Sequence, residues 1–168
     1  MAKPLVSIVI PTLNASRVLP ACLASIAAQD LIGDAELLVA DAGSADDSRE
    51  IALRFGARVL DNPLRTAEAG KAVGVRSARG EYLAFVDSDN ILPDRSWLGR
   101  MLAPFNEPDI VGAEPVRFTV RRSDHYLTRY FAGLGMNDPV CLFLGNYDRY
   151  CLLTGNWTGM PIRTTIRD

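Results

Sequence analysis

The alternation of short apolar runs with helix-like segments is the feature that most constrains how this chain can fold. Four runs are typical of buried strands: residues 6–10, 37–40, 57–60 and 82–86. Between them lie segments with helical periodicity or helix-forming composition: residues 18–26, 46–55 and 67–78. Because strand–helix–strand units form right-handed crossovers, this pattern predicts an α/β fold with three layers (αβα) and a mostly parallel sheet.

The length and composition fit one globular domain over residues 1–168. Hydrophobic residues make up 48% of the 168, and the net charge of −2 argues against a polybasic surface for nucleic acid. No apolar run approaches the ~20 residues of a membrane span. Pro11 interrupts the apolar start too early for a signal peptide. We therefore expect a cytoplasmic protein without nucleic acid as a partner.

The cysteines and the single histidine offer no framework for a disulfide-rich fold or a zinc site. Cys22, Cys141 and Cys151 are odd in number, include no C-x-x-C pair, and are accompanied only by His125. We expect ordinary buried thiols.

The alternation fades after about residue 105. Residues 109–120 are compatible with one long or two short strands, and residues 123–132 with a helix. Residues 133–168 show little periodicity and are rich in Gly, Asn and aromatic residues.

Polar clusters follow three of the expected strands: residues 11–14, 41–44 and 87–89. Each cluster alone has an ordinary structural explanation as a turn or a helix cap. Ligands of parallel sheets bind beyond the carboxyl ends of the strands, however, and all three clusters fall at that edge. Together they predict a binding site.

Asp87 and Asp89 are the most specific pair in these clusters. Two carboxylates at i and i+2 after a buried strand repel each other unless they share a cation or a proton. A strand end brings both within reach of one hard divalent ion, Mg²⁺ or Mn²⁺, whose other ligands can be phosphate oxygens and water. Asp41 differs, because a lone carboxylate beside small residues on a loop can accept a hydrogen bond from a flat heterocycle.

Three segments and their order resemble the inverting family-2 glycosyltransferases of the Rossmann-like GT-A fold: VSIVIPTLNAS, LLVADAGSADDS and ARGEYLAFVDSDN. The resemblance implies a nucleotide-diphospho-sugar donor, most often a UDP-sugar. It implies that Pro11, Thr12 and Asn14 line the nucleotide pocket. It also implies that Asp41 pairs with the base and that Ser44 lies at the following turn. Asp87, Ser88 and Asp89 are expected to contact ribose, diphosphate and metal, with Asp87 and Asp89 as the metal ligands.

Two positions depart from the family pattern. Lys71 lies where the family usually has an Arg-Asn segment beside the sugar nucleotide, and a solvated helix charge is an equal alternative for it. Ala42 replaces an Asp that many members carry.

The resemblance covers roughly residues 5–115, the expected nucleotide-sugar-binding part, and residues 116–168 are expected to begin the acceptor part. Family members are longer and carry a catalytic carboxylate downstream that deprotonates the acceptor hydroxyl. Asp138, Asp148 and Asp168 do not match that motif. We therefore expect the general base beyond Asp168, in a longer protein, with residues 1–168 alone inactive in transfer.

Two other functions are weighed against transfer. Asp87-Ser-Asp89 also resembles the start of a haloacid-dehalogenase-like phosphatase, but that chemistry requires a downstream lysine, and both lysines, Lys3 and Lys71, precede Asp87. A non-catalytic subunit that binds a nucleotide-sugar is the second alternative.

The acceptor is the least determined partner. A glycan or a lipid-linked sugar is expected, with peripheral association at the inner face of the membrane as a further hypothesis. Aromatic residues at irregular spacing could stack on such an acceptor, although packing is their commoner role: Phe131, Phe143, Tyr147, Tyr150 and Trp157.

Overall fold

A computed structural model describes residues 3–115, 120–135, 146–151 and 155–158. The chain divides into two compact units, Met1–Ala103 and Pro104–Asp168. This division is earlier than the boundary at residue 115 that the family resemblance implies, and the single domain over residues 1–168 stays a prediction. Each unit is described by itself.

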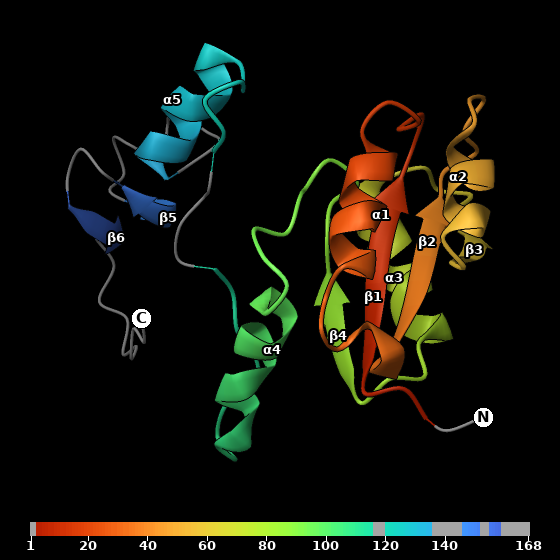
Figure 1. The fold of residues 1–168 in the computed structure, drawn as a ribbon, viewed down its shortest axis with the longest axis horizontal. Helices are drawn as coiled ribbons and strands as arrows, with labels where there is room; N and C mark the ends of the chain where they lie inside the picture. The colour runs from red at the N-terminus through yellow and green to blue at the C-terminus, as the bar shows by residue number, and fades with distance from the viewer. Residues whose placement is uncertain (1–2, 116–119, 136–145, 152–154, 159–168) are drawn as a thin grey trace. The chain divides into compact units, whose positions relative to one another are not determined.

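The N-terminal unit is built on a four-stranded parallel sheet with the order β3-β2-β1-β4 (Figure 1). Its strands are β1 (Val6–Thr12), β2 (Ala35–Asp41), β3 (Arg58–Asp61) and β4 (Tyr82–Phe85). Its helices are α1 (Leu19–Ala27), α2 (Ser48–Arg54), α3 (Ala67–Ser77) and α4 (Trp97–Leu102), with a 3-10 turn, η1, at Ile32–Asp34. The chain reverses its winding between β1 and β4, because β2 and β3 lie on one side of β1 and β4 on the other.

The predicted alternation of strands and helices is confirmed through β4. In each parallel pair the register is continuous, and Thr12 at the end of β1 lies beside Asp41 at the end of β2. The short helix α4 and the turn η1 were not expected, because both are too short for a clear periodic pattern.

The two faces of the sheet are covered by different helices. On one face, alternate residues of β1 and β2 pack with α1 and α2 in a continuous core that includes Val6, Ile8, Ile10, Leu23 and Ile26. The other residues of β1 face α3 on the far side of the sheet, as shown by the contact between Gly74 and Val9. The layers are therefore helix, sheet and helix, as predicted (Figure 1).

Glycines let α3 approach the sheet closely. A Cβ atom built on Gly74 would lie 2.2 Å from Val9 Cγ1, and one on Gly70 would lie 3.1 Å from Pro11 Cβ. These two glycines interrupt the Ala-rich helix pattern because β1 occupies the space that side chains would need.

Replacing Gly74 by alanine should destabilise the protein by about 1–3 kcal/mol. Alanine is favoured over glycine inside a helix by roughly 1 kcal/mol, but forcing a methyl group into a filled core costs more than this gain. Chemical denaturation of the full chain measures the difference. Gly99→Ala in α4 is the control, because its new Cβ would meet only Leu31 Cδ1 at 3.8 Å. A Gly74→Ala protein as stable as Gly99→Ala would contradict this account of α3.

The second unit contains α5 (Tyr126–Leu134), the strand β5 (Asn146–Cys151) and the strand β6 (Asn156–Thr158), and a further 3-10 turn, η2, spans Ala103–Asn106. β5 and β6 pair antiparallel. Helix α5 confirms the helix expected near residues 123–132. The hairpin was not expected, and the expectation of strands at 109–120 is wrong for the described residues 109–115 and 120, which form none. Residues 116–119 lie outside the described residues.

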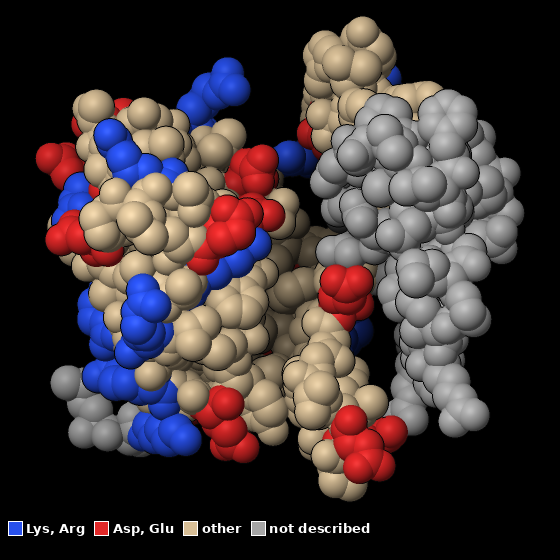
Figure 2. Space-filling view, turned by 180° about the vertical axis from the view of Figure 1, so that it is seen from behind, with Lys and Arg blue, Asp and Glu red and all other residues tan. Residues whose placement is uncertain are grey.

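Charges of both signs are spread over the α3 side of the N-terminal unit, as Figure 2 shows. Within the described part of the chain, no helix combines the length and the apolar character needed to cross a membrane.

Candidate functional site

The carboxyl edge of the sheet brings the three polar clusters together, as the topology predicts. Residues 11–14 include the end of β1 and the loop after it, and residues 41–44 include the end of β2 and its loop. Residues 87–89 follow β4, the strand on the other side of β1. Two hollows lie at this edge, and each contains residues singled out from the sequence.

The Asp87 hollow, of about 560 Å³, is the larger of the two. It is lined by most of the expected site residues, Pro11, Asn14, Lys71, Asp87, Ser88 and Asp89, together with neighbours from the loop after β1 and from the start of α3. The structure thus unites residues that lie up to 78 positions apart in sequence (89 − 11).

Asp87 and Asp89 present exposed carboxylates to this hollow. Lys71 Nζ lies 3.9 Å from Asp87 Oδ1, and both side chains are partly exposed. This position agrees better with a role of Lys71 in the site than with a solvated helix charge. A cation held here would have two protein carboxylates, since the described residues contain no cluster of three His, Cys, Asp or Glu side chains. Such a site fits Mg²⁺ or Mn²⁺, which commonly complete their coordination with water and phosphate oxygens.

The thiol of Cys22 lies beneath the same segment. It is fully buried and donates to the main-chain oxygen of Asp87, with 3.6 Å between sulfur and oxygen. Burial, with the charges of Asp89 and Asp87, raises the pKa of this thiol to about 12, so it keeps its proton. The expected buried thiols are confirmed for Cys22 and Cys151, while Cys141 lies outside the described residues.

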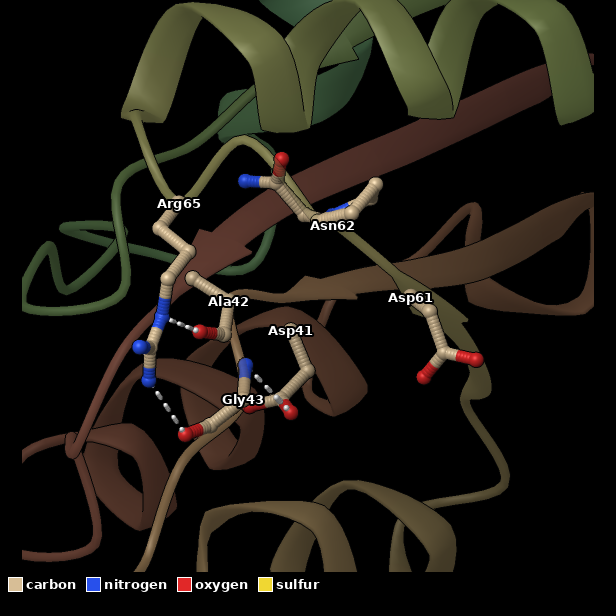
Figure 3. Close-up of a pocket in the computed structure, with 7 residues that line it drawn as sticks. Asp41, Ala42, Gly43, Asp61, Asn62 and Arg65 are labelled. Carbon is tan, nitrogen blue, oxygen red and sulfur yellow. Dashed lines mark hydrogen bonds between the residues drawn. The ribbon is translucent and has the colours of Figure 1, made fainter.

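The Asp41 hollow, of about 270 Å³, lies beside the ends of β2 and β3 (Figure 3). It is lined by Asp41, Ala42, Gly43, Asp61, Asn62, Pro63 and Arg65. The Arg65 guanidinium closes one side, because its Nε donates to Ala42 O at 2.8 Å and its Nη2 to Gly43 O at 3.2 Å. The hollow therefore combines an arginine and two carboxylates with a backbone turn.

Asp41 is the last residue of β2, and its side chain is 0% exposed. The expectation that it lies on a loop rather than in the core is wrong. Its Oδ2 accepts hydrogen bonds from Gly43 N at 3.1 Å, Ser44 N at 3.2 Å and Arg49 Nη1 at 2.9 Å. Burial acts to raise the pKa of Asp41, but hydrogen bonds from Ser44, Arg49 and Gly43 outweigh it and hold the pKa below its usual value. Asp41 is consequently ionised at neutral pH.

Asn14 and Ser44 join the loops that follow β1 and β2. Asn14 N donates to Ser44 Oγ at 2.9 Å, and Ala45 N donates to Asn14 Oδ1 at 2.8 Å. Asn14 has a φ of 48°, a left-handed conformation that asparagine tolerates better than most residues. Ser44 lies at the turn, as expected, but lines neither hollow.

Two further residues of this junction were missed. Asp46 Oδ2 accepts from Ser16 N at 2.9 Å, and Ser48 Oγ accepts from Ala15 N at 2.8 Å. The capping pattern at residues 46–48 was visible in the sequence only as the start of a helix. Its use in holding the neighbouring loop depends on the pairing of β1 with β2.

Thr12 is the second expected residue, after Ser44, that lines neither hollow. It is buried, and its Oγ1 donates to Ile10 O at 3.3 Å. It shares the face of β1 occupied by Ile8 and Ile10, so its side chain extends the core.

Comparison with known proteins identifies a family. A model described as glycosyl transferase family 2 matches residues 7–162. A PGL/p-HBAD biosynthesis glycosyltransferase of Mycobacterium tuberculosis is 39% identical over 113 residues, which cover 64% of this chain and 44% of that protein. The glycosyltransferase AglE of Haloferax volcanii is 28% identical over 148 residues, or 82% of this chain and 48% of AglE. The chain spans about half the length of these curated relatives.

Solved structures show the same fold. Glucosyl-3-phosphoglycerate synthase from Mycobacterium tuberculosis, solved with Mn²⁺, UDP and glucosyl-3-phosphoglycerate, is 29% identical with a TM-score of 0.52. The match covers 60% of this chain and 39% of the synthase. The mannosyltransferase PcManGT from Pyrobaculum calidifontis, solved with GDP-Man and Mn²⁺, has a TM-score of 0.60 at 22% identity. That match covers 65% of this chain and 34% of PcManGT. The Rossmann-like α/β fold expected from the sequence is confirmed.

Proposed function

The chain belongs to glycosyl transferase family 2, and on this premise we propose that its N-terminal unit binds a nucleotide-diphospho-sugar, preferably a UDP-sugar, as a glycosyl donor. The observation that carries the proposal is the Asp87 hollow, where Asn14, Lys71, Asp87 and Asp89 meet at the carboxyl edge of a GT-A type sheet. The family match does not favour the phosphatase alternative.

We assign the diphosphate to the Asp87 hollow. Asp87 and Asp89 would hold Mg²⁺ or Mn²⁺, which would supply positive charge to stabilise the leaving diphosphate. The Lys71 ammonium, 3.9 Å from Asp87 Oδ1, is placed to contact phosphate oxygens from the α3 side. Ser88 and Pro11 complete the lining beside the ribose and the phosphates.

We assign the base to the Asp41 hollow. An ionised carboxylate only accepts hydrogen bonds, so it favours a base whose ring nitrogen carries a proton, as in uracil, over cytosine, whose corresponding nitrogen is an acceptor. Because the Asp41 side chain is fully covered, a direct bond to the base requires the Gly43–Ser44 turn to shift. Glucosyl-3-phosphoglycerate synthase, solved with UDP, supports a uridine donor by family relationship.

Transfer itself proceeds, in this proposal, by attack of an acceptor hydroxyl on the anomeric carbon from the face opposite the diphosphate, with inversion. We assign no general base among the described residues, and its expected place beyond Asp168 stays a prediction. The acceptor, the cytoplasmic location and peripheral membrane association also remain proposals from the sequence.

Calorimetry should show that UDP binds the protein much more tightly with Mn²⁺ than after treatment with EDTA. The physical reason is that two carboxylates repel a diphosphate unless a divalent cation lies between them. CDP should bind about 10- to 100-fold more weakly than UDP. The Asp41 carboxylate would face the unprotonated ring nitrogen of cytosine, and the lost hydrogen bond costs about 1–3 kcal/mol. Equal UDP affinity with Mn²⁺ and EDTA would refute the proposed metal site, and equal affinity for CDP would refute the base assignment.

An assay with radiolabelled UDP-sugars separates an enzyme from a non-catalytic binding subunit. Residues 1–168 should bind the donor and transfer little sugar to crude membrane or polysaccharide acceptors, since loss of a general base typically removes ~10²–10⁴-fold in rate. Robust transfer would place the base within this chain and make Asp138 and Asp148 the first residues to replace.

A further inference from the structure

Two polar residues of α1 and one just past its C-terminal end bind the segment that carries Asp87 and Asp89. Cys22 and Ser25 lie three positions apart on one face of α1, and Gln29 follows the helix, which ends at Ala27. Each of the three bonds main-chain groups within residues 87–98, which comprise the loop after β4 and the first residues of α4.

The first two side chains hold the part of the segment nearest the aspartates. Cys22 Sγ donates to Asp87 O at 3.6 Å, an oxygen that also accepts from Asn90 N at 3.0 Å. Ser25 Oγ accepts from Leu92 N at 3.0 Å while donating to Cys22 O at 2.7 Å. The hydroxyl of Ser25 therefore links the helix backbone to the segment, because it donates to the helix and accepts from the segment.

Gln29 holds the far end of the segment. The residue is 3% exposed, and its Nε2 donates to Asp94 O at 2.7 Å while its Oε1 accepts from Leu98 N at 2.9 Å. The main chain of residues 86–96 forms neither helix nor strand, so its polar groups depend on partners of this kind.

The carboxylates of Asp87 and Asp89 have few restraints of their own. Both are exposed, the Asp87 side chain to 60%, and the ion pair with Lys71 is long at 3.9 Å. No described residue donates a hydrogen bond to the Asp89 carboxylate. The place of these carboxylates at the hollow is consequently set by the main chain of the segment, which α1 holds.

We propose that Cys22, Ser25 and Gln29 are positioning residues that fix the Asp87–Asp89 segment in the geometry that binds a divalent cation with a nucleoside diphosphate. The inference rests on the proposed function. It adds that these three side chains set the affinity for the metal by holding the main chain of its ligands, without contacting the metal themselves. Partners that orient metal ligands typically change metal affinity by 10–100-fold when they are removed.

Titration of Mn²⁺ at fixed UDP, followed by calorimetry and by the electron paramagnetic resonance of free Mn²⁺, tests the proposal. Ser25→Ala should raise the Mn²⁺ concentration for half-maximal UDP binding about tenfold, and Ser25→Thr, which keeps the hydroxyl, should restore it. If Ser25→Ala does not fold at the assay temperature, Cys22→Ala, which removes the bond to Asp87 O, is expected to give a rise in the same direction.

Ser7→Ala is the matched control, because it also removes a buried hydroxyl, hydrogen-bonded to Glu36 Oε1 at 2.7 Å and Gly80 N at 2.8 Å, but at the start of β1, away from both hollows. It should lower stability without changing the Mn²⁺ requirement. An unchanged Mn²⁺ requirement in the folded Ser25 or Cys22 variants would overturn the positioning role while leaving the proposed function standing. Absence of Mn²⁺-dependent UDP binding in the unaltered protein would overturn both.

Discussion

Replacing Asp89 by asparagine should weaken Mn²⁺-dependent binding of UDP by about 100-fold or more. An amide oxygen carries no net charge and is a weaker ligand for a hard divalent cation, and a 100-fold loss of affinity corresponds to about 2.8 kcal/mol. Three acidic residues line the Asp87 hollow, Glu68, Asp87 and Asp89, and this change removes one of the two carboxylates that we assign to the cation. Calorimetry at saturating Mn²⁺ measures the UDP affinity, and the EDTA-treated protein gives the metal-independent baseline.

Glu81→Gln is the matched control for this change. It also removes one negative charge from an exposed carboxylate, but Glu81 lies at the opposite end of β4 and lines neither hollow. UDP affinity should be nearly unchanged in this variant, because surface charges separated by more than a Debye length of about 10 Å are largely screened. An Asp89→Asn protein that binds UDP and Mn²⁺ as well as Glu81→Gln would remove Asp89 from the metal site.

The position of the site at the carboxyl edge of the sheet could be predicted from the sequence, because it follows from the order of the strands and helices alone. Once β1, β2 and β4 are parallel, Asn14, Asp41 and Asp87 must fall at the same edge, whatever the details of packing. The neighbouring position of Lys71 was suggested only by family resemblance, since its approach to Asp87 depends on the glycines that seat α3 on β1.

The side-chain environment of each residue was harder to predict. Thr12 lies next to Pro11 in a motif that looks entirely like a loop, yet strand parity places it with Ile10 in the core. Asp41 was expected on a loop because it precedes Gly43, whereas β2 extends through it. In both cases the strand extends past its apolar run, by two residues at the end of β1 and by one at the end of β2, and no sequence signal marks these residues.

The contacts that join separate loops could not be predicted at all. Ser48 and Asp46 form a local capping pattern, and Ser25 and Gln29 are ordinary polar residues, one on α1 and one just after it. Their partners, Ala15, Ser16 and residues 92–98, are brought near only by the folded sheet. Tertiary hydrogen bonds of this kind leave no periodic trace along the chain.

Replacing Asp41 by asparagine should lower the free energy of unfolding by about 2–4 kcal/mol. The new amide can no longer pair with the Arg49 charge, and its NH₂ group faces backbone N–H donors that the carboxylate satisfied. Breaking a buried ion pair costs roughly 3–5 kcal/mol, and the estimate is reduced because Arg49 is 43% exposed and keeps Asp61 as a partner. Urea denaturation at neutral pH measures the difference.

Asp61→Asn provides the control, and acid titration provides a second, independent readout. Asp61 is the other partner of Arg49 but is 82% exposed, so its replacement should change stability by no more than about 0.5 kcal/mol.

The pKa of Asp41 lies below its ordinary value in the folded protein, so the unfolded chain takes up a proton at a higher pH than the folded one. The stability that this carboxylate contributes is therefore complete above about pH 4 and is lost as the pH falls through the lower, folded pKa. Asp41→Asn should remove this part of the acid destabilisation while Asp61→Asn retains it. Parallel acid-unfolding curves for the unaltered and Asp41→Asn proteins would show that the buried carboxylate does not couple folding to pH.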